Sequence, residues 1–262
     1  MIKFSHLESS SDIPTEDWRI VVLEHDEGSK ELGGYVHRLW PDITEVCKIR
    51  ADLSTKEDIR QAIRSCIGDK KGRILTLYGS GKSHQLTYGL CTEVADKRSD
   101  EYGYVHFDAH NDFADSPSKT IDYGNFVREI MKDSNATALR HIGCVTCHIS
   151  PLISESVKNF RSVSRLEDPN DFKSLLKNLP DDVYATTDID VLKGHLAIAE
   201  SAWGEGPLSL NMYLECLDIL KTYKNLISAD VLGYSKGDCT WKDSNTLDTY
   251  AKIARKIISY NS

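Results

Sequence analysis

Aspartate and histidine side chains gather in three short segments of this 262-residue sequence, and each segment follows a predicted strand. The candidate set consists of His84, Asp108, His110, Asp112, Asp188 and Asp190. In an open parallel sheet, ligands bind beyond the carboxyl ends of the strands, so we expect these side chains to meet at one edge. If residues 108–112 remain extended, alternate side chains point the same way and converge.

Four carboxylates and two imidazoles form a hard donor set that suits Mn²⁺ or a similar divalent ion better than a thiolate-seeking metal. Two of the aspartates could bridge a pair of ions about 3.5–4 Å apart, which would lower the pKa of a shared water and yield hydroxide near neutral pH. Without cations, the four clustered carboxylates would repel one another. The segments therefore predict a two-metal hydrolytic site.

The elements that must position these residues alternate between short apolar runs and helix-length segments, which is the pattern of a parallel sheet covered on both faces. The predicted strands are Trp18–Glu24, Arg73–Tyr78, Tyr104–Phe107, Leu139–Val145, Asp182–Thr187 and Leu226–Leu232. The predicted helices cover residues 54–67, 85–97, 123–132, 170–179, 209–223 and 245–258. A capping box at Ser54–Glu57 would open the first helix. We expect one domain, residues 1–262, with an α/β fold: a three-layer α/β/α sandwich around a mostly parallel sheet.

Composition narrows the classes of partner and compartment. The net charge of −8 and the pI of about 5.6 argue against a nucleic-acid surface, which normally needs a basic stripe. No apolar run approaches the length of a spanning helix, and the start lacks a signal-peptide pattern, so we expect a cytoplasmic protein with no membrane partner. Seven cysteines without an evenly spaced framework predict reduced thiols.

The three segments resemble the metal motifs of the ureohydrolase superfamily, which contains the arginases and agmatinases. Gly79–Tyr88 is similar to the first motif, Val105–Asp112 to the second and Thr187–Leu192 to the third. Glu205–Ser209 is similar to the turn that opens the family's next helix, so the resemblance covers residues 73–235. It implies an arginase-like fold, two Mn²⁺ ions per chain and a chain that can form a homo-oligomer.

The resemblance also implies a role for each ligand. One metal would be bound by His84 and Asp112, the other by His110 and Asp190, and both by Asp108 and Asp188. Asp112 would also align the attacking hydroxide. The implied reaction adds hydroxide to a guanidinium carbon and releases urea and an amine.

The sequence departs from the family at positions that face the substrate. The family's guanidinium-binding glutamate is replaced by Gly233, its aspartate-proline pair by Lys193-Gly194, and its histidine proton shuttle by Tyr123, which becomes the candidate proton donor. A guanidinium prefers an anionic partner, which nearby acids could supply. The candidate substrate-binding residues are Asn111, Asn125, Glu205, Asp230 and Asp238.

The Gly-Asn-Phe sequence after Tyr123, Gly124–Phe126, resembles an uncharacterised arginase-like subgroup. Some relatives of that subgroup, the peptide arginases, convert arginine side chains of ribosomally made peptides into ornithine. A peptide substrate needs no pocket for a free α-amino and α-carboxylate group, which fits the departures. The leading prediction is therefore a peptide-modifying ureohydrolase. The alternatives are an agmatinase-like or arginase-like hydrolase of a free small guanidine, a metal-dependent deacetylase, and a catalytically inactive metal-binding regulatory protein.

The segment Gly79–Ser83 resembles part of a nucleotide-binding loop. The full pattern requires a glycine five residues before Gly81, where this chain has Thr76. Nucleotide binding is therefore disfavoured. If it occurred, Lys82→Ala would abolish it.

Overall fold

One parallel sheet organises the described part of the chain. The computed structural model describes residues 17–50, 52–68, 70–114, 120–145, 157–194, 196, 206–237 and 240–259. In these residues eight strands pair in the order β2-β1-β3-β8-β7-β4-β5-β6, every pair parallel. The strands are β1 (Trp18–Glu24), β2 (Thr44–Lys48), β3 (Arg73–Tyr78), β4 (Tyr102–Phe107), β5 (Ala136–Ile142), β6 (Phe160–Val163), β7 (Asp182–Asp188) and β8 (Asn225–Leu232).

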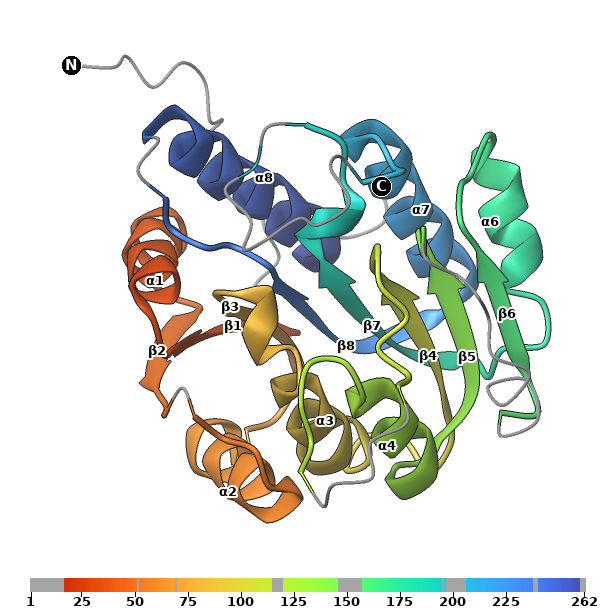
Figure 1. Cartoon of the computed structure of the whole chain (residues 1–262), viewed down its shortest axis with the longest axis horizontal. Coiled ribbons are helices and arrows are strands. Elements are labelled where there is room, and N and C mark those ends of the chain that lie inside the picture. Colours follow the sequence, from red (N-terminus) through yellow and green to blue (C-terminus); the bar gives the residue numbers. More distant parts are fainter. Residues whose placement is uncertain are drawn as a thin grey trace.

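Helices cover both faces of this sheet (Figure 1). They are α1 (Glu27–Leu39), α2 (Lys56–Ile67), α3 (Leu86–Leu90), α4 (Phe126–Asp133), α6 (Pro169–Leu175), α7 (Leu210–Tyr223) and α8 (Thr240–Ile258). Apolar residues of α1, α6, α7 and α8 pack in one core cluster, and those of α2, α3 and α4 pack in a second cluster on the opposite face. The predicted three-layer α/β/α sandwich is confirmed.

The strand β1 shows why the central strands are nearly all apolar. Ile20 and Val22 pack in the first cluster, whereas Val21 and Leu23 pack in the second. Successive side chains of a strand point to opposite faces, and here both faces are buried. The central strands consequently have well-defined bounds, and the chemistry lies beyond their carboxyl ends.

Three elements were not predicted, and several helix starts were predicted wrongly: α4 begins at Phe126 and not at residue 123, and α8 begins at Thr240 and not at residue 245. The edge strands β2 and β6 and the helix α1 are absent from the sequence prediction. The helix α2 is capped by Thr55, whose side chain accepts a hydrogen bond from the backbone N–H of Asp58, so Ser54 is not the cap. The capping box lies instead at α1, where Asp26 and Ser29 bond reciprocally.

The prediction of reduced thiols is correct only in part. Cys47 of β2 and Cys66 of α2 form a disulfide whose Cα atoms are 5.7 Å apart, and Cys144 is also disulfide-bonded. Cys91 and Cys216 are free and buried. Separately, none of the described helices combines the length and the apolar character needed to cross a membrane.

Candidate metal centre

The loop after β4 bends sharply and does not continue the strand. The carboxylate of Asp108 accepts a hydrogen bond from the backbone N–H of His110, at 2.6 Å from Oδ1. Asp112 has a φ of +47°, a left-handed conformation that is uncommon for a residue other than glycine, and its carbonyl accepts from Val127 N in α4. The expectation of an extended segment is wrong. The strained turn nevertheless directs the loop's side chains into one cavity.

A first group of donor atoms forms around His84, which follows the short turn Gly81–Ser83. The Nδ1 atom of His84 lies 3.2 Å from Oδ2 of Asp108 and 3.2 Å from Oδ2 of Asp112. Oδ2 of Asp188, at the end of β7, lies 3.9 Å from the same nitrogen. Ligands from three separate strand ends therefore meet at this point.

A second group forms around His110. Its Nδ1 atom lies 2.8 Å from Oδ2 of Asp190 and 3.4 Å from Oδ1 of Asp108. Asp190 is held in place because its Oδ1 accepts a hydrogen bond from the backbone N–H of Ala109, at 3.1 Å. Asp108 thus presents one carboxylate oxygen to each group, which is the arrangement of a bridging ligand.

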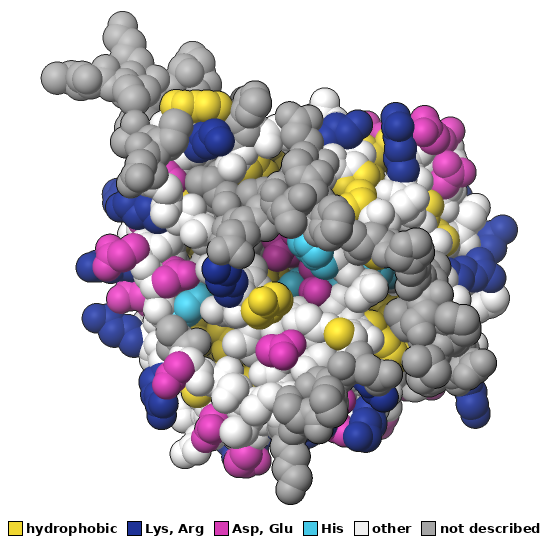
Figure 2. All heavy atoms as spheres, viewed as in Figure 1, with side chains coloured by type: hydrophobic (Ala, Val, Ile, Leu, Met, Phe, Trp, Pro, Cys, Tyr) yellow, Lys and Arg dark blue, Asp and Glu magenta, His cyan; other side chains and the backbone are white. Residues whose placement is uncertain are grey.

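All six predicted ligands line one cavity of about 340 Å³. The cavity lies at the carboxyl edge of the sheet, and Figure 2 shows histidine and acidic side chains gathered in a hollow near the middle of this face. A cavity of this size can hold a small molecule or a single long side chain.

The electrostatics of the cavity are those of a crowded acid cluster. Burial raises the pKa of the Asp112 carboxyl to about 8, and the nearby charge of Asp108 adds to the shift. Burial, together with Asp190 and Asp108, raises the pKa of Asp188 well above its usual range. Hydrogen bonds to Asp108 and Asp190 raise the pKa of His110 to about 11. The raised pKa values of the acids show that negative charge is crowded here, and that of His110 shows that a positive charge beside the acids is stabilised.

These residues fit a pair of divalent ions. The donor set is carboxylate oxygen and imidazole nitrogen, which suits hard or borderline divalent metals. Two groups of ligand atoms, each within a few ångströms, share Asp108 and lie side by side. Two divalent cations would balance the four carboxylates, which protonated histidines balance only in part.

His106 belongs to the first group and is not among the six predicted ligands. It is fully buried in β4, and its Nε2 atom lies 3.0 Å from Oδ2 of Asp108. The signal that could have identified it is its position two residues before Asp108 on a strand, since alternate side chains of a strand share a face. His106 can hold the bridging carboxylate or contribute a donor atom.

Asp230 is linked to His84 through the hydroxyl of Thr186, and it does not line the cavity. It is fully buried in β8 and accepts a hydrogen bond from Tyr184 at 2.6 Å and a short one from Thr186. The hydroxyl of Thr186 lies 3.3 Å from Nε2 of His84. The predicted contact between Asp230 and a substrate stays a prediction, and in this structure both oxygens of the carboxylate are bonded inside the sheet.

The other predicted substrate and catalytic residues divide into three groups. Asn111 and Tyr123 line the cavity, and Tyr123 is 54% exposed. Asn125 is buried, and its amide bonds to Asp122 N and Thr120 O within its own loop. Glu205 and Asp238 lie outside the described residues.

Gly233 has a structural reason for its lack of a side chain. Its φ is +109°, and a Cβ atom built there would overlap Oδ1 of Asp188. Its backbone N–H donates to Gly79 O at 2.7 Å, which brings the turn before His84 against the end of β8. A glutamate cannot occupy this position on the present backbone.

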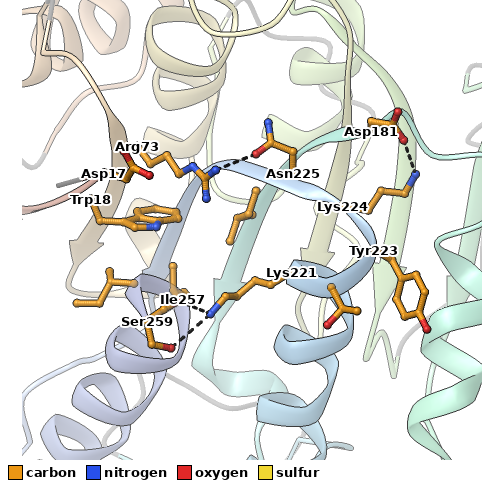
Figure 3. Close-up of a pocket in the computed structure, with 13 residues that line it drawn as sticks. Asp17, Trp18, Arg73, Asp181, Lys221, Tyr223, Lys224, Asn225, Ile257 and Ser259 are labelled. Carbon is orange, nitrogen blue, oxygen red and sulfur yellow. Dashed lines mark hydrogen bonds and ion pairs between the residues drawn. The ribbon is translucent and has the colours of Figure 1, made fainter. Parts of the chain in front are cut away.

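A larger cavity, about 530 Å³, lies at the opposite edge of the sheet between α7 and α8 (Figure 3). Its basic side chains are bonded within the protein. Lys221 donates to the carbonyls of Lys256 and Ser259, and Arg73 donates to Asn225. The first contact joins the end of α7 to the end of α8, and the second joins β3 to β8, so these basic side chains of the larger cavity make structural contacts.

Comparison with known proteins places the geometry in context. A family model described as "Arginase family" matches residues 8–259. A sequence comparison with curated proteins finds none that matches. Among solved structures, a hypothetical agmatinase from Burkholderia thailandensis is 21% identical, with a TM-score of 0.63 over 92% of this chain and 86% of that chain. The proclavaminate amidino hydrolase of Streptomyces clavuligerus is 17% identical, with a TM-score of 0.68 over 92% and 90%. The arginase of Bacillus subtilis subsp. subtilis is 16% identical, with a TM-score of 0.68 over 94% and 99%.

Proposed function

This chain belongs to the arginase family, and on that premise we propose that it is a binuclear manganese hydrolase that releases urea from a guanidino group. The preferred substrate in this proposal is the arginine side chain of a peptide, which is converted to ornithine. The observation that carries the two-metal claim is the shared position of Asp108, with one carboxylate oxygen in each of two ligand groups.

Each ligand has a place in the proposed centre. One ion would be held by His84, Asp108, Asp112 and Asp188, and the other by His110, Asp108, Asp188 and Asp190. When bound, the metals supply Lewis-acid polarisation and lower the pKa of a water. Manganese is favoured among divalent metals because the set contains no thiolate and is dominated by carboxylate oxygen.

The remaining steps belong to the side chains around the cavity. Asp112 accepts a hydrogen bond from the attacking water and orients it toward the guanidino carbon. Tyr123, on the exposed wall of the cavity, donates a proton from its phenol to the departing amine and regains one from solvent. Asn111 lines the same wall and can bond to the substrate's nitrogen atoms. Overall, water and a guanidine become urea and an amine.

The proposal of a peptide substrate is supported by the glycine at position 233, where the family has a glutamate. Gly233 leaves no carboxylate at the position where the family grips a free guanidinium. The names of the three similar structures specify agmatine, proclavaminate and arginine chemistry, so one fold serves different molecules. Affinity for a peptide can come from contacts outside the cavity, which compensates for a weak grip on the guanidinium.

Hydrolysis of a free small guanidine is the second candidate. The cavity volume of about 340 Å³ favours it, because that space is sufficient for a whole small molecule. The two candidates share the metal centre and the product urea. They differ only in what the guanidino group is attached to.

The test is a product assay on the manganese-loaded protein. Free arginine, agmatine and arginine-containing peptides are incubated separately, and urea is measured together with the mass of each peptide. We expect urea and ornithine from at least one peptide, and loss of both in Asp112→Asn. Asp181→Asn, at a fully exposed side chain, is the matched control and should retain activity. Urea from the small molecules but from no peptide would exclude the peptide substrate.

A further inference from the structure

His106 lies behind the metal cavity, near the end of β4, and has no role in the proposed hydrolysis. Its side chain is fully buried, and it is not among the described residues that line the cavity. It is nevertheless one of the four side chains of the first ligand group, because its Nε2 atom points at Asp108. This place allows two roles, as a ligand of the first ion or as a support for Asp108.

The distances around His106 favour the supporting role. Its Nε2 atom lies 3.0 Å from Oδ2 of Asp108 but 3.9 Å from Oδ2 of Asp112. The Nδ1 atom of His84 is more central to the group, at 3.2 Å from each of these two oxygens. An ionised carboxylate has only acceptor atoms, so the 3.0 Å contact requires Nε2 of His106 to carry a hydrogen and to donate it. A ring nitrogen that carries a hydrogen has no lone pair to offer to a metal.

The bridging carboxylate of Asp108 is thus held at both of its oxygens. Oδ1, which faces the second ligand group, accepts a hydrogen bond from the backbone N–H of His110 at 2.6 Å. Oδ2, which faces the first group, accepts from His106. Each carboxylate oxygen has two lone pairs, so one can accept from the protein while the other binds a metal. The two donors together fix the plane of the carboxylate and the direction in which it offers an oxygen to each ion.

The ring of His106 is itself fixed by packing. It stacks on His141 of β5, with centroids 4.7 Å apart and an interplanar angle of 20°. Phe126 of α4 meets it edge-on at 5.8 Å, and the same phenyl ring packs on His84 at 4.3 Å. The other ring nitrogen, Nδ1, is buried and has no hydrogen-bond partner among the described residues. The bonded polar atom of this ring is therefore Nε2, and its partner is the bridging carboxylate.

We propose that His106 is a positioning residue that holds Asp108 in the orientation needed to bridge two metals. This inference rests on the two-metal centre of the proposed function and is independent of the substrate. Without the donor at Oδ2, the carboxylate is still held at Oδ1 by His110 and can rotate about that bond. Such a rotation moves Oδ2 away from the first ion, which His84 helps to bind, and leaves the oxygen of the second ion in place. His106 secures the first metal site and touches neither metal nor substrate.

Two substitutions at position 106 separate the hydrogen bond from the packing of the ring. His106→Leu removes the donor and keeps an apolar side chain, whereas His106→Gln keeps an N–H donor at the same distance along the side chain. In a competition titration with Mn²⁺ we expect His106→Leu to weaken one of the two ions by about 10–100-fold, the range for loss of a residue that orients a ligand, and to leave the other unchanged. His106→Gln should recover most of that loss.

Two further variants show which ion is affected. In a His84→Asn protein, which has lost a ligand of the first ion alone, adding His106→Leu should not change the affinity of the second ion. His37→Leu, at an exposed histidine of α1, is the matched control and should bind both ions like the parent. Equal weakening of both ions in His106→Leu, the same loss in His106→Gln, or no loss in either variant would overturn the proposal.

A second measurement needs no substitution that could disturb folding. Long-range proton–nitrogen NMR spectra are recorded on the parent loaded with Zn²⁺, which is diamagnetic. We expect Nε2 of His106 to keep its hydrogen when both metals are bound, whereas a metal-bound Nε2 without a hydrogen would identify a ligand and overturn the proposal. If the metal affinities and the spectra follow expectation but no guanidine yields urea, the proposed hydrolysis fails and the role of His106 stands.

Discussion

Replacing Gly233 with alanine tests why the substrate-gripping glutamate is absent. The structure has φ at +109° and a would-be Cβ that overlaps Oδ1 of Asp188, so alanine must strain the backbone and displace a metal ligand. Holding a non-glycine residue in such a conformation costs about 1–3 kcal/mol, before any cost of moving Asp188. We expect Gly233→Ala to lower the unfolding free energy of the metal-free protein by at least that amount, and to weaken metal binding.

The matched control is Gly34→Ala in α1. A Cβ atom at Gly34 meets nothing closer than the Arg38 side chain at 3.7 Å, so alanine should stabilise the helix by about 0.5–1 kcal/mol. Denaturant midpoints at constant m-value report both changes, and metal titration reports the second effect of Gly233→Ala. The two variants should move in opposite directions. A Gly233→Ala protein with parental stability and two bound metals would refute the steric reasoning, as would a Gly233→Glu protein that gains arginine hydrolysis.

Three further predictions concern the metal centre. Asp108→Asn should reduce the metal content below two ions per chain in elemental analysis, because Asp108 presents one carboxylate oxygen to each ligand group, whereas Asn111→Ala should not, because Asn111 belongs to neither group. Asp230→Asn should weaken metal binding by about 10–100-fold in a competition titration, since Asp230 orients His84 through a threonine hydroxyl; unchanged affinity would contradict that role. Metal affinity should rise with pH by about tenfold per unit for each proton released, because His110, with a pKa of about 11 in the metal-free protein, must lose its proton to bind a metal. Calorimetry in buffers of different ionisation enthalpy counts those protons, and a count of zero would contradict the assignment of His110.

The sequence predicted the central sheet well because its strands are buried on both faces. The bounds of β1 and β3 match the prediction residue for residue, since most residues of each strand are apolar and buried. The two strands that were missed, β2 and β6, are the two edges of the sheet and contain polar, partly exposed residues. The helix α1 was missed because three glycines, Gly28, Gly33 and Gly34, hide its helical pattern.

The residues of the candidate site could be predicted from the sequence only in part. The six ligands could be selected by residue type and by their place after strands, and the structure gathers them around one cavity. The structural environments of Asp230 and Asn125 could not be predicted, because the burial and the direction of a side chain depend on packing between segments that are distant in the sequence. His106 could have been selected by its alternation with Asp108. The need for a glycine at position 233 could be recognised only from the position of Asp188, which lies at the end of the neighbouring strand β7.

Urea release by the manganese-loaded protein tests the central claim most directly. The protein is brought to two Mn²⁺ per chain, verified by elemental analysis, and incubated with substrates labelled at the guanidino carbon. The account predicts labelled urea together with the corresponding amine, and loss of the label's release in Asp112→Asn. A protein with two bound Mn²⁺ that forms no urea from any free or peptide-borne guanidine would contradict it.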